Sequence, residues 1–388
     1  MKKIAVILQG QFNDRKGMFN AAHNRVLHLK NIANYEIDVY MISFYPWGGM
    51  RLFSKEERVN HVEICELDGV QYRIKWVADP LVDYISEVRL HRTRYIRNIQ
   101  LKRLCSFFKD YDLIDAHSLN AGYVAQLIKS KYSIPYVVTW HGSDIHQSAF
   151  NSELNKKRII RIIENADMNF FVSKNLLEVS NRITENGNKM VLYNGCDSRF
   201  KRLDERSLSL LKEQYGVSKK KVVSFCGTLI PIKNALVLPK VFEMVSRQVG
   251  DVQFWFVGDG KHRAELENQT KNLDVVFWGN QPPEKMPEFM NLTDVLVLPS
   301  KNEGLPLVAA EALNCGAHAV GSKVGGIPEV MGEVNTFDLN SPNFEKELAE
   351  RILYFLTDGI NAEQPVASHF DWKVTARIEN DIINKMLK

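Results

Sequence analysis

The chain has 388 residues, of which 45% are hydrophobic and 25% are charged, and its formal net charge is +4. This composition is typical of a soluble globular protein and excludes a disordered, fibrous or membrane-spanning one. The length exceeds what one ordinary hydrophobic core accommodates, and it predicts two domains.

Apolar runs of strand length alternate with longer amphipathic or charged segments along the chain. The first run, within residues 1–10, ends at Leu8 and is too short for the core of a signal peptide, so it predicts a β-strand. The later runs are "YEIDVYMISF", "LIDAHS", "PYVVTWHG", "MNFFVS", "KVVSFCG", "VQFWFVG", "VVFWGN", "DVLVLPS" and "HAVGSKVGG". Strands separated by helix-length segments predict βα units and mainly parallel sheets.

A charged segment without strand character, residues 194–221, separates two series of such runs. We therefore expect an N-terminal domain over residues 1–198 and a C-terminal domain over residues 199–369. The last residues, 370–388, have apolar side chains at helical spacing and predict an amphipathic helix that docks on the N-terminal domain. These side chains are Trp372, Val374, Ile378, Ile382 and Met386.

The cysteines are five, scattered along the chain and never arranged as C-x-x-C. This pattern indicates reduced thiols in a cytoplasmic protein, with neither a disulfide framework nor a zinc site.

Two glutamates, Glu303 and Glu311, lie eight positions apart in the stretch "KNEGLPLVAAEAL". A strand over residues 295–298 is expected to end just before them, and Pro306 suits the first turn of a helix that runs to about Cys315. Ligands of open parallel sheets bind beyond the carboxyl ends of the strands, so this loop is a candidate site.

The start of that helix would present free backbone N–H groups of Leu305, Leu307 and Val308 to a phosphate or sugar oxygen. A helical rise predicts that the two carboxylates are about 10 Å apart, the spacing of the sugar and the ribose in a nucleotide sugar. The alternative is a solvated loop glutamate and a surface glutamate of a helix.

Residues 300–330 resemble the retaining glycosyltransferases of family 4, whose hallmark is Glu, seven residues and Glu, followed by Gly-Gly-x-Pro-Glu, here residues 325–329. Other stretches fall in the family's order, and the resemblance covers nearly the whole chain. They are "HGSD" (141–144), "NGCD" (194–197), "GTLIPIKN" (227–234) and "VGDG" (257–260).

The resemblance implies an α/β fold of GT-B type, with two Rossmann-like doubly wound parallel-sheet domains that face a central cleft. The C-terminal domain would hold the nucleotide sugar, and UDP is favoured over GDP because it is the commoner nucleotide in the family. The donor-binding residues would be Gly17, Gly227, Thr228, Lys233, Gly258, Gly260, Phe277, Trp278, Gly279, Glu303, Gly304, Leu305, Pro306, Leu307, Val308 and Glu311.

Three of these positions receive a chemical role from the resemblance. Glu311 would bind the ribose hydroxyls, Glu303 the hydroxyls of the donor sugar, and Lys233 the diphosphate as it gains charge on leaving. The family usually pairs this lysine with an arginine at the position of Thr228, so the chain departs from the pattern there. Either Lys233 and the helix start suffice, or another basic residue substitutes, or the donor is bound more weakly.

The remaining site residues have structural alternatives. Phe277 and Trp278 would flank the base through backbone contacts, or they belong to the core of a strand. His141 would be a catalytic contact to the donor sugar, together with Lys233 and Glu303. Asp144 would contact the acceptor or orient His141, or serve only as a helix N-cap. Gly17 would allow close approach of the ligand, or mark an ordinary turn.

No Asp-x-Asp metal motif accompanies these loops, and Lys233 with the helix dipole would supply positive charge. We therefore expect no metal and no cofactor, the nucleotide sugar being a co-substrate. The family retains the anomeric configuration, with the favoured route being attack on the face from which the phosphate departs.

A basic run over residues 89–103 contains six cations and no acidic residue: Arg89, Arg92, Arg94, Arg97, Lys102 and Arg103. A solvated helix is one interpretation, and nucleic-acid binding lacks a recognition motif. We favour contact with anionic lipid or a lipid-linked acceptor at the inner face of the membrane.

The sequence thus predicts an enzyme that moves a hexose-type sugar from a UDP-sugar to a saccharide or lipid-linked saccharide, in bacterial surface polysaccharide synthesis. The alternative is a catalytically weak nucleotide-binding protein of the same fold. A phosphorylase or an epimerase on this architecture is a third class.

Overall fold

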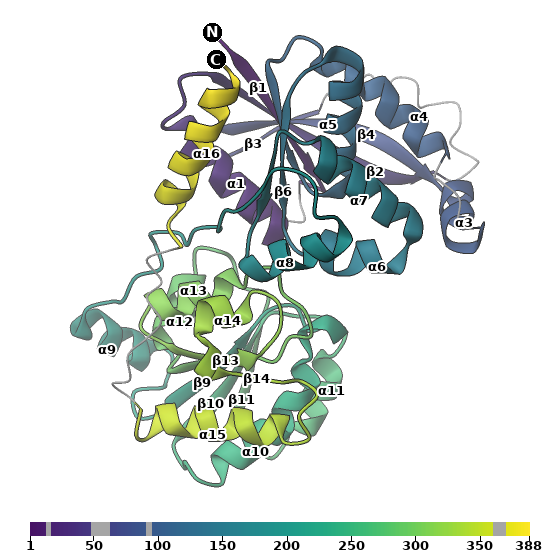
Figure 1. The fold of residues 1–388 in the computed structure, drawn as a ribbon. Coiled ribbons are helices and arrows are strands. Elements are labelled where there is room, and N and C mark those ends of the chain that lie inside the picture. Colours follow the sequence, from purple (N-terminus) through teal and green to yellow (C-terminus); the bar gives the residue numbers. More distant parts are fainter. Residues whose placement is uncertain (13–16, 48–62, 91–94, 360–369) are drawn as a thin grey trace. The chain divides into compact units, whose positions relative to one another are not determined.

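The computed structural model describes residues 1–12, 17–47, 63–90, 95–359 and 370–388. The chain forms two compact units, each with its own sheet (Figure 1). The first comprises Met1–Gly195 and Trp372–Lys388, and the second comprises Cys196–Asp371. The expected boundaries were 198/199 and 369/370.

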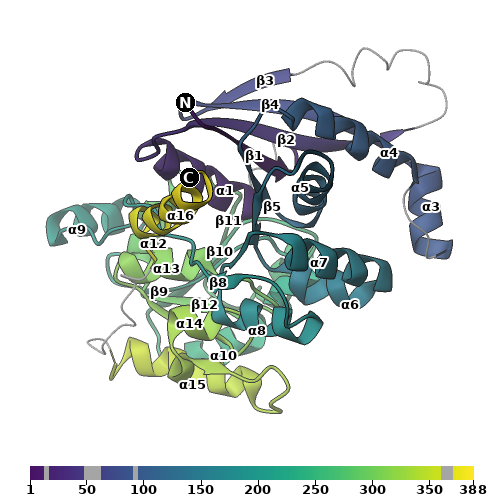
Figure 2. The same ribbon diagram turned by 45° about the horizontal axis from the view of Figure 1, so that its top comes forward.

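The first unit is built on an eight-stranded sheet in the order β3-β4-β2-β1-β5-β6-β7-β8. All neighbouring strands are parallel except β3 and β4, which lie at one edge (Figure 2). The strands are β1 Lys3–Gln9, β2 Glu36–Trp47, β3 Glu63–Leu67, β4 Val70–Pro80, β5 Leu113–His117, β6 Tyr136–Trp140, β7 Met168–Phe171 and β8 Lys189–Val191.

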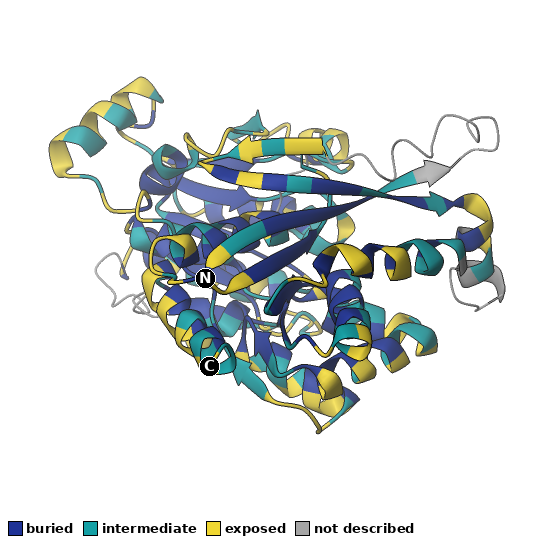
Figure 3. Ribbon diagram, turned by 90° about the horizontal axis from the view of Figure 1, so that it is seen from above, coloured by how far each residue is buried: buried dark blue, intermediate teal, exposed yellow. Residues whose placement is uncertain are grey.

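Helices cover both faces of this sheet. They are α1 Gly17–Lys30, α3 Leu81–Leu90, α4 Tyr95–Leu104, α5 Leu119–Tyr132, α6 Ala149–Asn151, α7 Glu153–Asn165, α8 Lys174–Ile183 and α16 Trp372–Met386, with the short turns η2 Cys105–Phe108 and η3 Asp144–Ser148. α1 and α16 pack on each other, whereas α5 packs on α4 and α7. With both faces covered, the central strands are buried (Figure 3).

The hairpin of β3 and β4 is an element that the analysis of the sequence missed. Asp68 and Gly69 join the strands, and both have positive φ, at 49° and 74°. An Asp-Gly pair between two strand-like runs is the strongest local hairpin signal. The run over residues 70–80 carries Arg73 and Lys75, and these charges hid it from a search for apolar runs.

The C-terminal helix is present as expected, and it buries the predicted face in part, since Ile382 and Met386 pack against the core of the first unit. Trp372 is buried, whereas Val374 and Ile378 are 43% and 37% exposed. The buried face instead includes Thr375 and Glu379. Thr375 donates a hydrogen bond to the backbone oxygen of Tyr193, so polar partners help to set this face together with the buried apolar side chains Trp372, Ala376 and Ile383.

The second unit has a six-stranded, fully parallel sheet in the order β11-β10-β9-β12-β13-β14. In order of sequence this is 3-2-1-4-5-6, the doubly wound arrangement in which the direction of winding reverses between the first and the fourth strand. The strands are β9 Lys221–Cys226, β10 Val252–Val257, β11 Val275–Gly279, β12 Val295–Leu298, β13 His318–Ser322 and β14 Thr336–Phe337.

Helices also cover both faces of the second sheet, with α10 and α15 packed together on one and α12, α13 and α14 on the other (Figure 1). The helices are α9 Glu205–Gln214, α10 Leu238–Ser246, α11 Arg263–Gln269, α12 Met286–Leu292, α13 Leu307–Asn314, α14 Ile327–Met331 and α15 Phe344–Leu356, with the short turns η4 Pro231–Lys233, η5 Ala235–Val237 and η6 Glu333–Asn335. β12 occupies the residues predicted for it.

Candidate active site

The loops after β9 and β12 meet where the winding of the second sheet reverses. Lys233 ends the turn η4 after β9, and its Nζ lies 2.5 Å from Oε1 of Glu303, which follows β12. The hydroxyl of Ser300 donates to the same carboxylate oxygen at 2.9 Å. The backbone N–H of Lys301 donates to the backbone oxygen of Ile232 at 2.8 Å, which ties the two loops together.

This ion pair is accessible enough to meet a ligand. The side chains of Lys233 and Glu303 are 29% and 14% exposed. The predicted partners of the diphosphate and of the donor sugar therefore contact each other in the unliganded unit. The sequence placed each residue in its loop, but it gave no sign that the two side chains pair.

The Gly-Gly loop of residues 325–329 lies against the loop that carries Glu303. The N–H of Gly326 donates to the backbone oxygen of Glu303 at 3.2 Å. A Cβ at Gly325 would overlap that oxygen, and one at Gly326 would overlap the backbone oxygen of Gly304. Only glycine permits this approach of one backbone to another, so the second loop fixes the first.

The glycines after β9, β10 and β11 meet in the same way. The N–H of Gly227 donates to the oxygen of Val257, and that of Gly258 donates to the oxygen of Gly279. A Cβ at Gly258 would overlap the oxygen of Gly227, and one at Gly260 would lie 2.6 Å from the oxygen of Leu229. These predicted donor-site glycines therefore have a packing role of their own.

The helix after β12 begins at Leu307, with Pro306 at its N-cap position. The N–H of Leu307 donates to the backbone oxygen of Leu305 at 3.0 Å. The predicted free amide of Leu307 is therefore wrong for this structure, because a tight turn before the helix engages it. The amides of Leu305 and Val308 stay predictions as ligand contacts.

Glu311 lies one turn inside α13, in a setting that the sequence did not reveal. Burial chiefly raises the pKa of its carboxyl, to about 7; the negative charge of Asp197 adds to the shift and Arg199 opposes it. Glu311 in turn raises the pKa of three nearby thiols, in each of which burial is the larger cause. They are Cys196, Cys226 and Cys315.

The aromatic pair at the end of β11 is packed into its own unit. The ring of Phe277 stacks on Phe256, with centroids 4.8 Å apart. Trp278 packs on Tyr215, Trp255 and Phe289, with centroids 5.3 to 5.5 Å away. Of the two interpretations, the side chains match the core one, and a backbone contact to a base stays a prediction.

The missing arginine leaves Thr228 half-buried after β9. Lys301 is exposed and belongs to the loop that is hydrogen-bonded to Ile232, next to Lys233. The backbone thus brings a basic residue beside the Lys233 turn, and it is a candidate substitute that the sequence motifs did not suggest.

The predicted residues of the first unit lie at the carboxyl ends of its strands. Gly17 begins α1, and a Cβ there would meet no atom of the described residues within 4 Å, so the described part of the chain does not require glycine at this position. His141 follows β6, and its Nε2 lies 3.0 Å from Nδ1 of His117. Burial lowers the pKa of His141 well below its ordinary value, with His117 and Arg25 adding to the effect.

Asp144 serves as a link between two elements. Its carboxylate accepts a hydrogen bond of 3.2 Å from the N–H of Leu119, the first residue of α5. Burial raises its pKa to about 6, although this hydrogen bond opposes the shift. This is a capping contact to a helix elsewhere in the chain, and the predicted contact to an acceptor stays a prediction.

The basic run divides into parts with different surroundings. Arg92, Arg94 and the side chain of Arg89 lie outside the described residues. Arg97 is 7% exposed and stacks over the ring of Phe44, so its place in a surface patch is wrong, because the aromatic ring and the sheet cover it.

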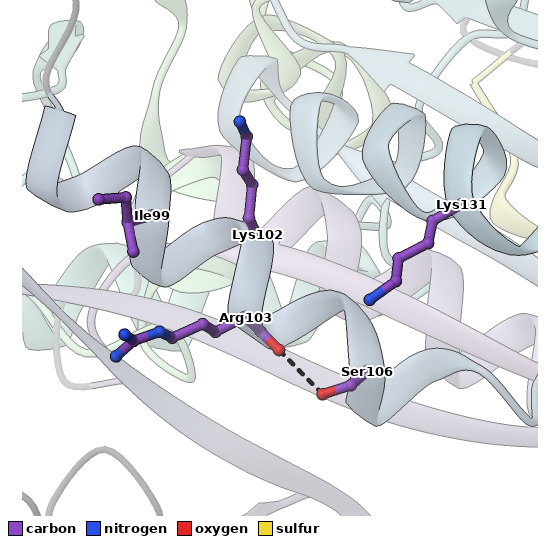
Figure 4. A pocket seen from close by; sticks show the side chains of 5 residues that line it. All are labelled: Ile99, Lys102, Arg103, Ser106 and Lys131. Carbon is purple, nitrogen blue, oxygen red and sulfur yellow. Dashed lines mark hydrogen bonds between the residues drawn. The ribbon is translucent and has the colours of Figure 1, made fainter.

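The other two cations of the run, Lys102 and Arg103, are exposed and line an open hollow of about 430 Å³ (Figure 4). Its remaining lining residues are Ile99, Ser106 and Lys131. Lys131 comes from α5, so the fold adds a cation that lies outside the run. None of the helices in the described residues is long and apolar enough to cross a membrane.

No group of three or more His, Cys, Asp or Glu side chains in the described residues is arranged to hold a metal ion. The expectation of metal-independent chemistry remains a prediction.

Comparisons with known proteins agree with this architecture. Residues 33–200 match the family described as Glycosyltransferase Family 4, and residues 220–358 match Glycosyl transferases group 1. The chain is therefore a glycosyltransferase with two parallel-sheet domains of GT-B type. It belongs to glycosyltransferase family 4, as the ordered motifs indicated.

The relatives differ in the sugars that their names record. N-acetyl-alpha-D-glucosaminyl L-malate synthase of Bacillus anthracis is 29% identical over 62% of this chain and 63% of its own length, so the chain spans less than two thirds of that relative. An uncharacterized glycosyltransferase of Methanocaldococcus jannaschii is 28% identical over 81% of this chain and 87% of its own length. UDP-Gal:alpha-D-GlcNAc-diphosphoundecaprenol alpha-1,3-galactosyltransferase of Escherichia coli is 27% identical over 71% and 78%.

Two solved structures share the fold across nearly all of both chains. Anabaena HepE in complex with UDP has a TM-score of 0.73 at 18% identity, with 99% of this chain and 100% of that chain covered. Sucrose-phosphate synthase from Thermosynechococcus elongatus has a TM-score of 0.74 at 18% identity, with 100% and 99% covered.

Proposed function

We propose that this enzyme moves a hexose-type sugar from a UDP-sugar to a saccharide or lipid-linked saccharide, with retention of the anomeric configuration. The observation that carries the proposal is the contact of Lys233 with Glu303, a cation and a carboxylate from the two loops that flank the switch point of a doubly wound sheet. Nucleotides bind at such switch points. A nucleotide sugar offers a diphosphate to the ammonium and hydroxyls to the carboxylate.

In the proposed complex the donor lies along the start of α13. The amides of Leu305 and Val308 face the diphosphate, Glu303 accepts hydrogen bonds from sugar hydroxyls, and Glu311 accepts them from the ribose diol. Lys233 exchanges Glu303 for the diphosphate when the donor binds. The ion pair of the free enzyme therefore holds both side chains beside the positions that they occupy in the complex.

The proposed chemistry needs no carboxylate nucleophile. The bond from the anomeric carbon to the diphosphate oxygen breaks as the acceptor oxygen bonds to that carbon on the same face. The acceptor proton passes to the departing phosphate oxygen. Lys233 and the positive end of α13 stabilise the charge that grows on the diphosphate, so this route uses no metal and no cofactor.

The names of relatives support UDP as the nucleotide. The E. coli relative is named for UDP-Gal, and Anabaena HepE was solved with UDP and with UDP-glucose. A mycobacterial relative is GDP-mannose-dependent, so the test includes both nucleotides.

The acceptor that we propose is a saccharide or a lipid-linked saccharide of a bacterial surface polysaccharide, met at the inner face of the membrane. The hollow lined by Lys102, Arg103 and Lys131 presents three cations to an anionic surface. The diphosphoundecaprenol in the name of the E. coli relative supports a lipid-linked acceptor.

Thr228, at a position where the family usually has arginine, favours a second candidate function, a weak nucleotide-binding protein. Thr228 can donate one hydroxyl hydrogen bond there, but it carries no positive charge.

For the enzyme, we propose that Lys301 supplies the second cation beside Lys233. Lys301→Ala should then weaken binding of UDP more than Lys219→Ala, a control at another exposed lysine of the same unit. Equal binding by both variants would contradict this role of Lys301.

The test of the function is release of nucleotide from a panel of UDP- and GDP-sugars during long incubation with and without saccharide acceptors. An enzyme liberates UDP from one donor faster than the Lys233→Ala variant does, and NMR of the product reports an unchanged anomeric configuration. Binding of UDP without any release would favour the second candidate, and inversion would overturn the proposed mechanism.

A further inference from the structure

Two residues that no motif singled out connect His141 to the buried interior of the first unit. Asp115 and His117 lie two positions apart on β5, so their side chains share one face of the sheet, and both are fully buried. Nδ1 of His117 lies 3.0 Å from Nε2 of His141, and Nε2 of His117 lies 3.6 Å from Oδ2 of Asp115. The three groups form a row from the core to the end of β6.

The row also adjoins the charged pair that anchors the C-terminal helix. The buried guanidinium of Arg25 lies 3.4 Å from Oε1 of Glu379 and donates to the hydroxyl of Thr139 on β6. The pKa of Glu379 is raised, chiefly by burial; Arg25 opposes this shift and Asp115 adds to it. The row of His141, His117 and Asp115 therefore lies beside a second set of buried titratable groups.

Two imidazole nitrogens at 3.0 Å share one hydrogen, so one nitrogen donates and the other accepts. Within the described residues, neither the two oxygens of Asp115 nor Nε2 of His117 has a hydrogen-bond partner, and Nε2 lies 3.6 Å from Oδ2 of Asp115, within reach of its charge. The lone pairs of the carboxyl oxygens favour a hydrogen on that nitrogen. When His117 is neutral, its imidazole has one N–H, so its Nδ1 is the acceptor and Nε2 of His141 is the donor.

We infer that Asp115 and His117 are positioning residues that hold His141 in the tautomer protonated at Nε2, which leaves Nδ1 of His141 as a hydrogen-bond acceptor for the donor sugar. The inference rests on the proposed function and on the contact of His141 with the donor sugar that the family resemblance implies. A sugar hydroxyl can donate a hydrogen bond to this acceptor nitrogen, whereas a hydrogen or a fluorine at the same position of the sugar cannot. The pair therefore makes the enzyme select donors that carry a hydroxyl there, because an unpaired buried acceptor is costly.

The first arm of the test reads the tautomer directly and does not need activity. The protein is labelled with ¹⁵N at histidine, and long-range ¹H–¹⁵N correlation distinguishes Nδ1–H from Nε2–H rings; the loss of one signal set in His141→Gln assigns His141. We expect Nε2–H in the wild type and a changed pattern in Asp115→Asn and His117→Phe. His28→Gln, a control in the same unit, should leave the His141 signals unchanged.

A His141 ring protonated at Nδ1 in the wild type, or signals unchanged in both variants, would overturn the inference. Asp115→Asn is nearly isosteric and decides the question by itself where His117→Phe does not fold. If the protein turns over no donor at all, the proposed function is refuted, but the NMR measurement still shows which tautomer His141 adopts.

The second arm measures selectivity. For the donor that the enzyme uses, kcat/KM is compared with that of each monodeoxy and deoxyfluoro analogue. For one hydroxyl of the sugar, we expect its removal or replacement by fluorine to lower kcat/KM by about tenfold or more in the wild type. The same change should lower kcat/KM by less than about threefold in His117→Phe, and the His28→Gln control should behave like the wild type. A lower kcat with unchanged selectivity would mean that His117 is only structural, and it would refute the inference.

Discussion

Lys233 and Glu303 form an ion pair with each other in the free enzyme. Both are partly exposed, so their mutual attraction in the free enzyme is screened by solvent and contributes little to stability. In the complex that we propose, Lys233 lies beside the diphosphate and Glu303 beside the donor sugar. Substitution at either position should therefore affect catalysis much more than folding.

The first prediction concerns Lys233→Ala. We expect kcat/KM for the donor to fall by about 100-fold or more, because the cation acts on charge that grows in the transition state. The temperature of unfolding should change by about 2 °C or less. Lys240→Ala is the control, since Lys240 pairs with Glu345 on the surface of the same unit. Wild-type turnover of Lys233→Ala would show that the site is assigned wrongly.

The second prediction follows from the raised pKa of Glu311. An elevated pKa keeps the carboxyl protonated to a higher pH, so the carboxylate that accepts two ribose hydroxyls is gained as the pH rises through about 7. Binding of UDP should therefore tighten from pH 6 to pH 8, by up to about tenfold. Calorimetry at several pH values measures this change.

Glu311→Gln controls for the nucleotide itself, because a terminal phosphate also loses a proton near pH 6. The variant should bind UDP more weakly at pH 8 and show only the pH dependence of the phosphate. An equal pH dependence in both proteins would contradict the role given to Glu311.

At the scale of elements, the loop of residues 325–329 is a support for the loop of Glu303. Gly325 has a φ of 53°, and its missing Cβ makes room for the backbone oxygen of Glu303. Sequence reasoning found both loops through their motifs. It did not find their contact, because the close approach of two backbones leaves no trace in spacing or hydropathy beyond the glycines themselves.

The third prediction is that Gly325→Ala destabilises the unit and also misplaces Glu303. A strained backbone and the overlap together should cost about 1–3 kcal/mol, which corresponds to a fall of roughly 2–10 °C in Tm. Binding of UDP-sugar should weaken more than binding of UDP. Gly250→Ala is the matched control, because no atom in the described part of the chain lies within 4 Å of its Cβ position.

If Gly325→Ala melted with the wild type and bound donor normally, the two loops would be independent. If it lost stability but kept the full preference for UDP-sugar over UDP, the loop would support the fold and not the site.

The C-terminal helix shows where periodicity misleads. Its apolar spacing predicted the element and part of the buried face, but it gave no sign of Glu379, which lies within the core opposite Arg25. A buried ion pair joins two residues 354 positions apart, and no local pattern reports such a partner. The hairpin at Asp68 is the opposite case. Its Asp-Gly turn is a local signal, but the strands beside it contain charged residues, so a pattern of apolar runs does not predict them.

At the scale of the molecule, the alternation of strands and helix-length segments predicted parallel sheets, and the motifs predicted the family. Both are confirmed. The position of Arg97 was predicted wrongly because charge alone says nothing of what covers a side chain. Lys131 was missed because α5 brings it to the hollow from outside the basic run.

The fourth prediction tests the proposed membrane contact. Replacement of Lys102, Arg103 and Lys131 by serine should abolish flotation with vesicles that contain anionic lipid. Vesicles of neutral lipid should bind neither the wild type nor this variant. The control replaces three exposed lysines of the second unit, Lys219, Lys271 and Lys346, which lowers the net charge equally. Equal loss in both variants would indicate a bulk charge effect, and flotation by the first variant would refute the hollow as the contact.

The second unit is inserted between the two segments of the first, because Trp372–Lys388 completes the first unit after the second has been made. During synthesis, domains commonly fold as they emerge, beginning with the N-terminal one. Here the described strands of both sheets are translated before Glu379, the buried partner of Arg25. The half of the enzyme that is translated first therefore receives its last helix only after the whole of the other half has been made.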